Sequence, residues 1–494
     1  MGFIQKDALR ITIFSYLGMF LGYVNKAFLF VILLSVEQIG LLNLILSVGL
    51  LMAQFCNLGS AYTIIKFLPF FRNKSKRDYG FFPYNVLIVT VGVVIFTLIS
   101  FLFKPQISSY YATKSPQFVH YYFWFIPIGI AYVYYMLFEN FLKAIYKNLI
   151  PVVVYEVGLR LLTTIALLVY AANWISFDIL VKISSAIYII PTLVLVAYLI
   201  YLKEFNLDFG TIRISKRFRR ILFKFTAFSF VSTLGNIVVT TIDALMIAAY
   251  LGLGETGIYT TIVFITAFLQ VPYRSLIRIV NPLIAEYWKA RDMTKMGELY
   301  KQSSSVLLVI STTLFMYVWI NCENLFYLLK PEFVTGINVF LFLMIGRLTD
   351  MYFGINGQIF TLSKKFAYDL IFTITLIFLV YGLNVLLIPK LGMNGAALGS
   401  MVAILVYNFG RALFVWFQFH LHPFTKSQLW VLLIFAANVI LFEFIPHFDN
   451  RFLDIFVRSA LFSLSYPLLL VVFKVEKEIN NYVDKILVQL HLKR

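Results

Sequence analysis

Charge is scarce in this sequence of 494 residues. Only 13% of the residues are charged, whereas 61% are hydrophobic. A soluble domain carries about 25% charged residues, and no soluble fold could bury so much apolar surface. The composition therefore excludes a soluble globular protein and favours an integral membrane protein.

Cysteine and histidine are also rare. The two cysteines, Cys56 and Cys322, have no neighbours at metal-ligand spacing, so we expect neither a disulfide framework nor a metal centre. None of the five histidines lies in the middle of an apolar run, where a membrane enzyme would hold a buried general base. A G-x-x-x-x-G-K-[ST] loop for nucleotide phosphates is missing too. We therefore expect no enzyme, no cofactor and no direct use of ATP.

Long apolar runs are abundant. They are about twenty residues long, which predicts transmembrane helices rather than the alternating strands of about ten residues found in closed barrels. We count about fourteen such spans, with 221–250 as the seventh, 304–329 as the ninth and 334–360 as the tenth. The predicted fold class is an all-α integral membrane protein.

The distribution of basic residues predicts the orientation of these spans. With the N-terminus inside, the inner segments hold most of the lysines and arginines, and this bias is typical of cytoplasmic loops. We therefore expect both termini in the cytoplasm. The dense basic stretch 213–220 is interpreted as an anchor on the anionic membrane surface. The net charge of +18 has the same origin, and no nucleic-acid partner is expected.

A shift of 217 residues aligns two halves of the chain. The segment 15–29 matches 232–246 at several positions, and Gly40 meets Gly257. Both halves start inside, so this is a parallel repeat of a kind known in transporters. The pattern predicts two six-helix lobes around a central cavity, followed by two C-terminal helices. The expected limits are 1–208 for the N-terminal lobe, 209–420 for the C-terminal lobe and 421–494 for the last two spans with a cytoplasmic tail.

Asn25 and Lys26 lie near the middle of the first span. A charge at the bilayer centre costs about 2.5–3.5 kcal/mol on insertion scales, so Lys26 needs a polar partner or water. In the repeat, Lys26 is opposite Asp243. The two side chains could form a standing ion pair that locks the lobes. Alternatively the pair is intermittent, and Lys26 binds an anionic substrate in one state; we favour this second interpretation.

Other polar side chains recur within the spans. Those expected to line a hydrated cavity are Arg160, Arg274, Arg278, Arg347, Asp350 and Arg411, together with Asn25, Lys26 and Asp243. The competing interpretation is structural, because small and polar faces also hold membrane helices together. Glu156 with Arg160, and Arg347 with Asp350, have the spacing of local ion pairs.

Arg274 and Arg278 differ from the other charged residues of the spans. Neither has an acidic residue within one helical turn along the sequence. We therefore favour a functional role for this pair.

Three stretches carry a resemblance to a known family. They are SVEQIGLLNLILSV (35–48), GSAYTIIKFLPFF (59–71) and LLIPKLGMNGAALGSMVA (386–403). The sequence resembles the polysaccharide, O-antigen-type flippases of the multidrug/oligosaccharidyl-lipid/polysaccharide exporter superfamily. The last stretch is similar to the turn between spans 11 and 12 in that family.

This resemblance implies a function in lipopolysaccharide or related polysaccharide biosynthesis. An undecaprenyl-diphosphate-linked oligosaccharide would move from the cytoplasmic to the periplasmic leaflet of the bacterial inner membrane by alternating access. Because the sequence has no nucleotide-binding loop, the energy would come from an ion gradient with H+ or Na+ as the coupling ion, from the membrane potential, or from consumption of the substrate downstream. Membrane lipids and the polysaccharide polymerase machinery are the implied partners. The alternatives are a cation-coupled multidrug antiporter or a lipid II flippase of the same superfamily, and a membrane glycan polymerase or ligase.

Overall fold

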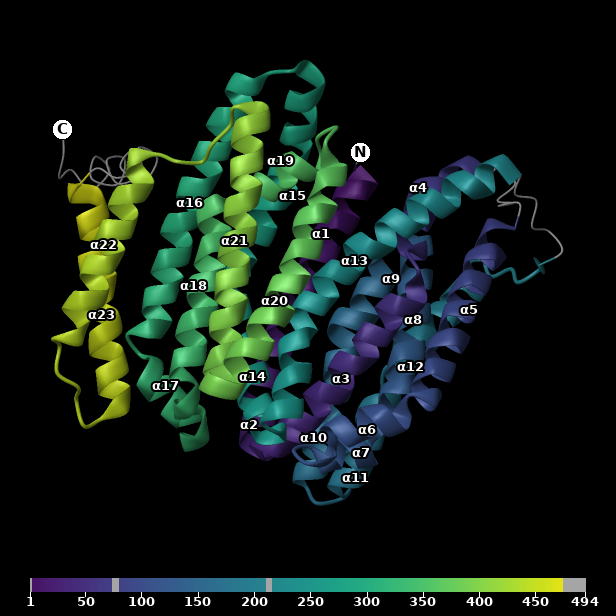
Figure 1. Ribbon diagram of the computed structural model, residues 1–494, viewed down its shortest axis with the longest axis horizontal. Coiled ribbons are helices and arrows are strands. Elements are labelled where there is room, and N and C mark those ends of the chain that lie inside the picture. The colour runs from purple at the N-terminus through teal and green to yellow at the C-terminus, as the bar shows by residue number, and fades with distance from the viewer. Residues whose placement is uncertain (1, 73–79, 210–215, 474–494) are drawn as a thin grey trace. The chain divides into compact units, whose positions relative to one another are not determined.

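A computed structural model describes residues 2–72, 80–209 and 216–473 (Figure 1). These residues form helices, turns and irregular segments and contain no strand, so the predicted all-α class is confirmed. Within them, 13 helical segments are long and apolar enough to cross a membrane. The chain is therefore a multi-pass membrane protein.

The chain divides into two compact units, Met1–Thr261 and Ile262–Arg494. The first unit contains α1 (Gly2–Tyr23), η1 (Val24–Leu29), α2 (Phe30–Leu33), α3 (Val36–Asn57), α4 (Ser60–Phe71), α5 (Phe81–Leu102), α6 (Lys104–Ala112), α7 (Pro116–His120), η2 (Tyr122–Trp124), α8 (Phe125–Ala144), α9 (Leu149–Val152), η3 (Val153–Gly158), α10 (Leu159–Ala171), α11 (Phe177–Ala186), α12 (Ile189–Tyr201), α13 (Lys216–Tyr250) and the first part of α14 (Leu253–Thr266).

The second unit contains the remaining helices. They are η5 (Ala267–Leu269), α15 (Gln270–Ala290), α16 (Met293–Trp319), α17 (Cys322–Leu329), η6 (Pro331–Gly336), α18 (Ile337–Phe353), α19 (Asn356–Thr361), η7 (Phe366–Tyr368), α20 (Asp369–Leu391), α21 (Met393–Phe419), α22 (Lys426–Glu443) and α23 (Arg451–Val472).

The expected seventh span is the 35-residue helix α13. Its stretch Ile237–Tyr250 is apolar but too short to count among the 13 spanning segments of the described residues. Because α13 packs within the first unit, the boundary between the units lies after Thr261 and not at the expected lobe boundary 208/209. The division into lobes stays a prediction. The start of the basic stretch 213–220 lies outside the described residues.

Two predicted span limits are wrong because the helices break. The segment 304–329 is not continuous, since α16 ends at Trp319 and the separate helix α17 follows. The segment 334–360 is broken at Gly354, whose φ of +57° lies in the left-handed region that glycine adopts at little cost. These breaks divide both predicted spans into a long helix and a short one.

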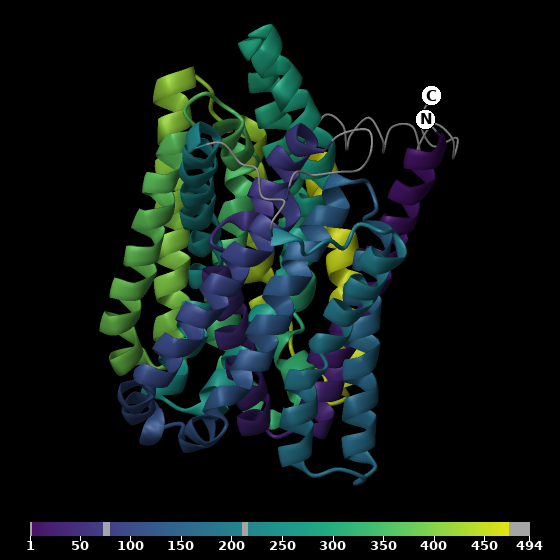
Figure 2. The same cartoon turned by 90° about the vertical axis from the view of Figure 1, so that its right-hand side faces the viewer.

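The predicted turn between two spans lies at Gly392, and the MNGAALG segment that follows it is the start of α21. Gly392, with φ +62°, separates α20 from α21, and the two helices pack as a long antiparallel pair (Figures 1 and 2). A side-chain carbon at Gly395 would overlap the carbonyl group of Leu387. Glycine at this position therefore allows the two helices to approach each other closely directly after the turn.

Inside the first unit, α3 and α14 cross with their backbones in contact. A side-chain carbon at Gly40 would overlap the carbonyl of Leu253, and one at Gly257 would overlap the carbonyl of Val36. Gly40 and Gly257 are 217 residues apart, and so are Val36 and Leu253. The crossing is thus symmetric at the shift that aligns the two halves of the sequence, which supports the repeat register.

The last two helices, α22 and α23, pack on α16 in the second unit (Figure 1). Their core includes Met316, Val431 and Phe462, and the Thr312 and Tyr466 hydroxyl groups form a 2.6 Å hydrogen bond inside it. At the end of this core, Arg458 Nε lies 3.0 Å from Asp454 Oδ2. These contacts explain how the C-terminal pair is held on the second unit.

Candidate functional site

Asn25 and Lys26 lie in the π-helix η1, which interrupts the first span. Single π-helical turns within α-helices occur frequently at functional sites because they displace the side chains from the regular helical positions. The Lys26 ammonium group donates to Asn43 Oδ1 on α3 and lies 4.3 Å from the centroid of the Phe30 ring. An amide oxygen and an aromatic face therefore offset the desolvation of Lys26.

Asn43 links Lys26 to the second repeat. Its Nδ2 group donates to Thr260 Oγ1 at 2.9 Å, so a chain of hydrogen bonds runs from η1 through α3 to α14. Asn43 and Thr260 are 217 residues apart and are therefore repeat mates. We did not select either residue from the sequence. The repeat shift was the signal that could have found them, because it also aligns Gly40 with Gly257 beside them.

Asp243 lies in a buried position on α13. The Tyr259 hydroxyl group donates to Asp243 Oδ2 at 2.5 Å. Among the described residues, Lys26 forms its polar contact with Asn43 and makes no ion pair with Asp243. This structure therefore does not contain the standing pair between the two repeat mates, and the intermittent pair stays a prediction.

The face of the first span that carries Gly18, Gly22 and Asn25 packs against the neighbouring segments η3 and α10. Asn25 Nδ2 donates to the Arg160 carbonyl at 2.8 Å, and the Thr164 hydroxyl group donates to Asn25 Oδ1 at 2.7 Å. Side-chain carbons at Gly18 and Gly22 would approach Glu156 and Arg160 too closely. The contacts of Asn25 are those of a residue that packs α1 and η1 against η3 and α10.

Arg160 is held by the predicted local ion pair. Its Nη1 atom lies 2.6 Å from Glu156 Oε2 and also donates to the Glu156 carbonyl. Glu156 belongs to the second π-helix of the described chain, η3. Both side chains are partly exposed, at 27% for Arg160 and 32% for Glu156. The two charges are therefore matched to each other at a position that is not fully buried.

Asp350 and Arg347 do not form the predicted local ion pair. Asn408 Nδ2 donates to Asp350 Oδ1 at 2.7 Å, and among the described residues Arg347 acts on this carboxylate only electrostatically. The i,i+3 spacing places Arg347 and Asp350 on one face of α18, but the Asp350 carboxylate accepts its hydrogen bond from Asn408 on α21 instead. The local pair, which was the structural interpretation of this spacing, is therefore not formed among the described residues, and the cavity-lining role of Arg347 and Asp350 stays a prediction.

Arg411 on α21 pairs with Asp369, the first residue of α20. The distance from Arg411 Nη2 to Asp369 Oδ1 is 2.8 Å, and the guanidinium group lies 4.7 Å from the centroid of the Tyr407 ring. A side-chain carbon at Gly357 would collide with the Arg411 guanidinium, so glycine makes room for it. Arg411 and Asp350 thus belong to one polar region within the second unit, and Asn408 and Asp369 are its further members.

Arg274 and Arg278 lie one turn apart on α15, and both are exposed. Arg274 Nη2 contacts Gln270 Oε1 at 3.4 Å. Neither arginine forms an ion pair with a carboxylate in the part of the chain that the structure describes. The second unit therefore presents two adjacent guanidinium groups whose charges are not neutralised by the protein there. Planar guanidinium groups of this kind bind phosphate through paired hydrogen bonds.

A family model described as "Polysaccharide biosynthesis protein" matches residues 4–288, which is more than half of the chain. The chain belongs to this polysaccharide biosynthesis family. No curated protein matches the sequence.

Solved structures of transporters share the fold. The lipid II flippase MurJ in an inward closed conformation matches with a TM-score of 0.75 at 12% identity, covering 94% of this chain and 98% of that chain. An inward-facing multidrug resistance MATE family transporter of the MOP superfamily matches with a TM-score of 0.59 at 12% identity, covering 82% of this chain and 94% of that chain. A mutant of the Vibrio cholerae MATE transporter VcmN matches with a TM-score of 0.51 at 14% identity, covering 85% of this chain and 98% of that chain. The polysaccharide biosynthesis family member described here therefore has the fold of MOP superfamily transporters.

Proposed function

We propose that this protein is a flippase for undecaprenyl-diphosphate-linked oligosaccharides. It would move the repeat unit of an O-antigen, capsule or exopolysaccharide from the cytoplasmic to the periplasmic leaflet of the bacterial inner membrane. Membership of a polysaccharide biosynthesis family combined with a transporter fold carries this proposal. The fold is one of transporters, and we assign the protein no catalytic reaction.

Basic side chains within each of the two units support an anionic substrate. Arg274 and Arg278 are exposed on one face of α15, and Lys26 lies within the first span. A diphosphate needs cationic donors to leave water, and a charge-assisted hydrogen bond contributes about 1.5–3 kcal/mol. By the predicted topology the spanning segment Leu253–Ala290, which contains α14 and α15, runs inward. Arg274 and Arg278 lie past its middle, toward the cytoplasm, where the substrate is loaded. We therefore assign the diphosphate to these two arginines.

The symmetric crossing of α3 and α14 supports alternating access. By the predicted topology both helices begin at the periplasmic side, and they meet there through Gly40 and Gly257. At this crossing the two helices meet through glycines and backbone carbonyls. Such a contact can close the periplasmic side tightly, and it can open again without breaking an ion pair. We propose that its opening releases the oligosaccharide, with H+ or Na+ as the coupling ion.

The decisive experiment removes the two guanidinium charges. The Arg274→Gln and Arg278→Gln double variant, reconstituted in vesicles with a labelled lipid-linked oligosaccharide, should flip the substrate more slowly by at least about tenfold, because two charge-assisted contacts are lost. Lys289→Gln, a charge removal at the end of the same helix, is the matched control and should flip normally. An unchanged rate in the double variant would remove the diphosphate from these residues.

A lipid II flippase is the second candidate, favoured by the TM-score of 0.75 to MurJ and by the two additional C-terminal helices. To separate the two functions, this protein is expressed in cells from which the lipid II flippase has been depleted, and in a strain that lacks its polysaccharide flippase. Growth would identify lipid II as a substrate, whereas restored surface polysaccharide in a flippase-deficient strain would identify the oligosaccharide. Resistance of a drug-sensitive strain would instead indicate the multidrug antiporter.

A further inference from the structure

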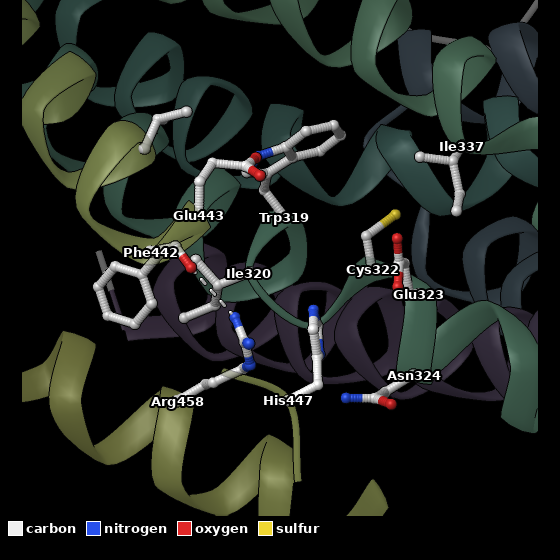
Figure 3. A pocket seen from close by; sticks show the side chains of 11 residues that line it. Trp319, Ile320, Cys322, Glu323, Asn324, Ile337, Phe442, Glu443, His447 and Arg458 are labelled. Carbon is white, nitrogen blue, oxygen red and sulfur yellow. Dashed lines mark hydrogen bonds between the residues drawn. The ribbon is translucent and has the colours of Figure 1, made fainter. Parts of the chain in front are cut away.

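A polar pocket of about 110 Å³ lies where α16, α17, α22 and α23 meet (Figure 3). The polar side chains around it include Glu323 and Asn324 from α17, Glu443 at the end of α22, and His447 from the loop that follows. Figure 3 shows the His447 ring and both glutamates around the same opening. The pocket is far in sequence from Lys26, and none of the residues assigned to substrate binding lines it.

An apolar groove of about 330 Å³ adjoins this pocket. Its lining is entirely hydrophobic, and it includes Phe315 on α16, Ile345 on α18 and Phe435 on α22. Trp319 and Val439 line both the groove and the polar pocket. The two cavities therefore form one amphipathic site, with an apolar part between helices and a polar part at their ends.

The charged side chains of the polar part that form no ion pair among the described residues are carboxylates. Glu323 and Glu443 are exposed, and neither forms an ion pair with any residue that the structure describes. Arg458 also lines the pocket, but its charge is paired with an acid. Its Nε atom lies 3.0 Å from Asp454 Oδ2, and its Nη2 atom donates to the Ile445 carbonyl. His447 Nδ1 contacts the same Asp454 at 3.2 Å. Two carboxylates thus remain for a cation.

The position of the site matches the surface of a bilayer. α16 ends at Trp319, α22 ends at Glu443, and α23 begins at Arg451, so the polar part lies at the ends of three spans. Tryptophan is enriched at this level of membrane proteins, beside the lipid headgroups. The groove continues from there along the apolar parts of α16, α18 and α22. A ligand that fits must have a polar cationic head and an apolar tail.

We infer that this site binds a membrane phospholipid with a primary ammonium headgroup, of the phosphatidylethanolamine class. An acyl chain lies in the groove, and the ammonium group donates to Glu323 and Glu443. The Arg451 guanidinium lines neither cavity, but it lies 3.3 Å from the centroid of the Tyr327 ring, one turn along α17 from Glu323. We assign the lipid phosphate to this cation, outside the polar pocket. This inference does not depend on which substrate the protein transports.

The test measures lipid binding to the purified full-length protein in detergent by native mass spectrometry. The probes are phosphatidylethanolamine, phosphatidylcholine and phosphatidylglycerol with identical acyl chains. Phosphatidylethanolamine should bind about tenfold more tightly than phosphatidylcholine, because only a primary ammonium donates hydrogen bonds to the carboxylates. The double variant Glu323→Gln with Glu443→Gln should lose this preference, and the control Glu332→Gln, an exposed acid outside the pocket, should keep it.

A second variant tests the groove. Ala436→Phe places a ring in the apolar part and should weaken the binding of all three phospholipids, while leaving the headgroup order unchanged. Equal binding of phosphatidylethanolamine and phosphatidylcholine to the natural protein would overturn the inference. It would also be overturned if undecaprenyl phosphate bound more tightly than any phospholipid and Ala436→Phe abolished that binding, because the groove would then hold the isoprenoid tail.

Discussion

At the scale of single residues, the Lys26 ammonium donates to the amide oxygen of Asn43 and lies over the Phe30 ring. Asn43→Leu removes the acceptor of the Lys26 ammonium and should lower the free energy of unfolding by about 1–3 kcal/mol, since a partly buried charged donor loses its partner. Thermal unfolding in detergent measures this change. Thr260→Val leaves that acceptor in place and should cost less. If the two variants unfold at the same temperature, Asn43 is not the group that stabilises Lys26.

The charges of Lys26 and Asp243 have separate surroundings, and an exchange of the two tests this. The sequence alone predicts that Lys26→Asp combined with Asp243→Lys restores folding but not flipping. The structure leads us to expect no recovery of folding, because a carboxylate at position 26 would lie against the acceptor Asn43 Oδ1, and the two exchanged charges contact separate groups rather than each other. Expression level and melting temperature, compared with each single variant, are the readout. Full recovery would reinstate the standing pair between the repeats.

At the scale of helices, the crossing of α3 and α14 needs two glycines. Gly257→Ala places a methyl group on the Val36 carbonyl, so the helices must separate, and overpacking of this kind typically costs about 1–3 kcal/mol. We expect a lower melting temperature and impaired transport. Gly254→Ala is the matched control, since its nearest neighbour is Glu37 Oε1 at 3.7 Å, an ordinary contact. Equal effects of both substitutions would argue against a tight crossing.

The π-helices η1 and η3 are a second feature at this scale. Each interrupts a span beside a charged residue, Lys26 in one and Glu156 in the other, and the Asn25 side chain connects them through the Arg160 backbone. A straight α-helix would rotate these side chains to other faces. The two interruptions therefore decide which polar groups of α1 and α10 can meet.

At the scale of the whole molecule, the predicted topology can be checked with cysteine labelling in intact cells. Lys330→Cys, after α17, should react with a membrane-impermeant maleimide, whereas Lys295→Cys, at the start of α16, should react only after permeabilisation. The natural cysteines, Cys56 and Cys322, are buried and should give little background. Reaction of position 295 in intact cells would reverse the assigned orientation and place the termini outside.

Composition and spacing were enough to establish the class of the protein and much of its layout. Runs of about twenty apolar residues can be accommodated only as spanning helices, because backbone groups in lipid must be satisfied within the segment. The turn at Gly392 was also predictable, since glycine between two apolar runs accepts a left-handed φ. The repeat shift of 217 residues aligned Gly40 with Gly257, which meet at the crossing of α3 and α14. The local pair of Glu156 and Arg160 followed from helical spacing alone.

The partners of the other charges became known only from the packing of the helices. Lys26 contacts Asn43, and Asp350 contacts Asn408, although spacing and repeat symmetry pointed to Asp243 and Arg347. Helical periodicity determines which face of a helix a side chain occupies, but it does not determine which distant helix covers that face. That choice depends on where helices cross, break or change to a π-helix, and so on contacts between residues far apart in the chain. The physical reason is that a buried polar group takes the nearest competent partner, and distance is set by packing.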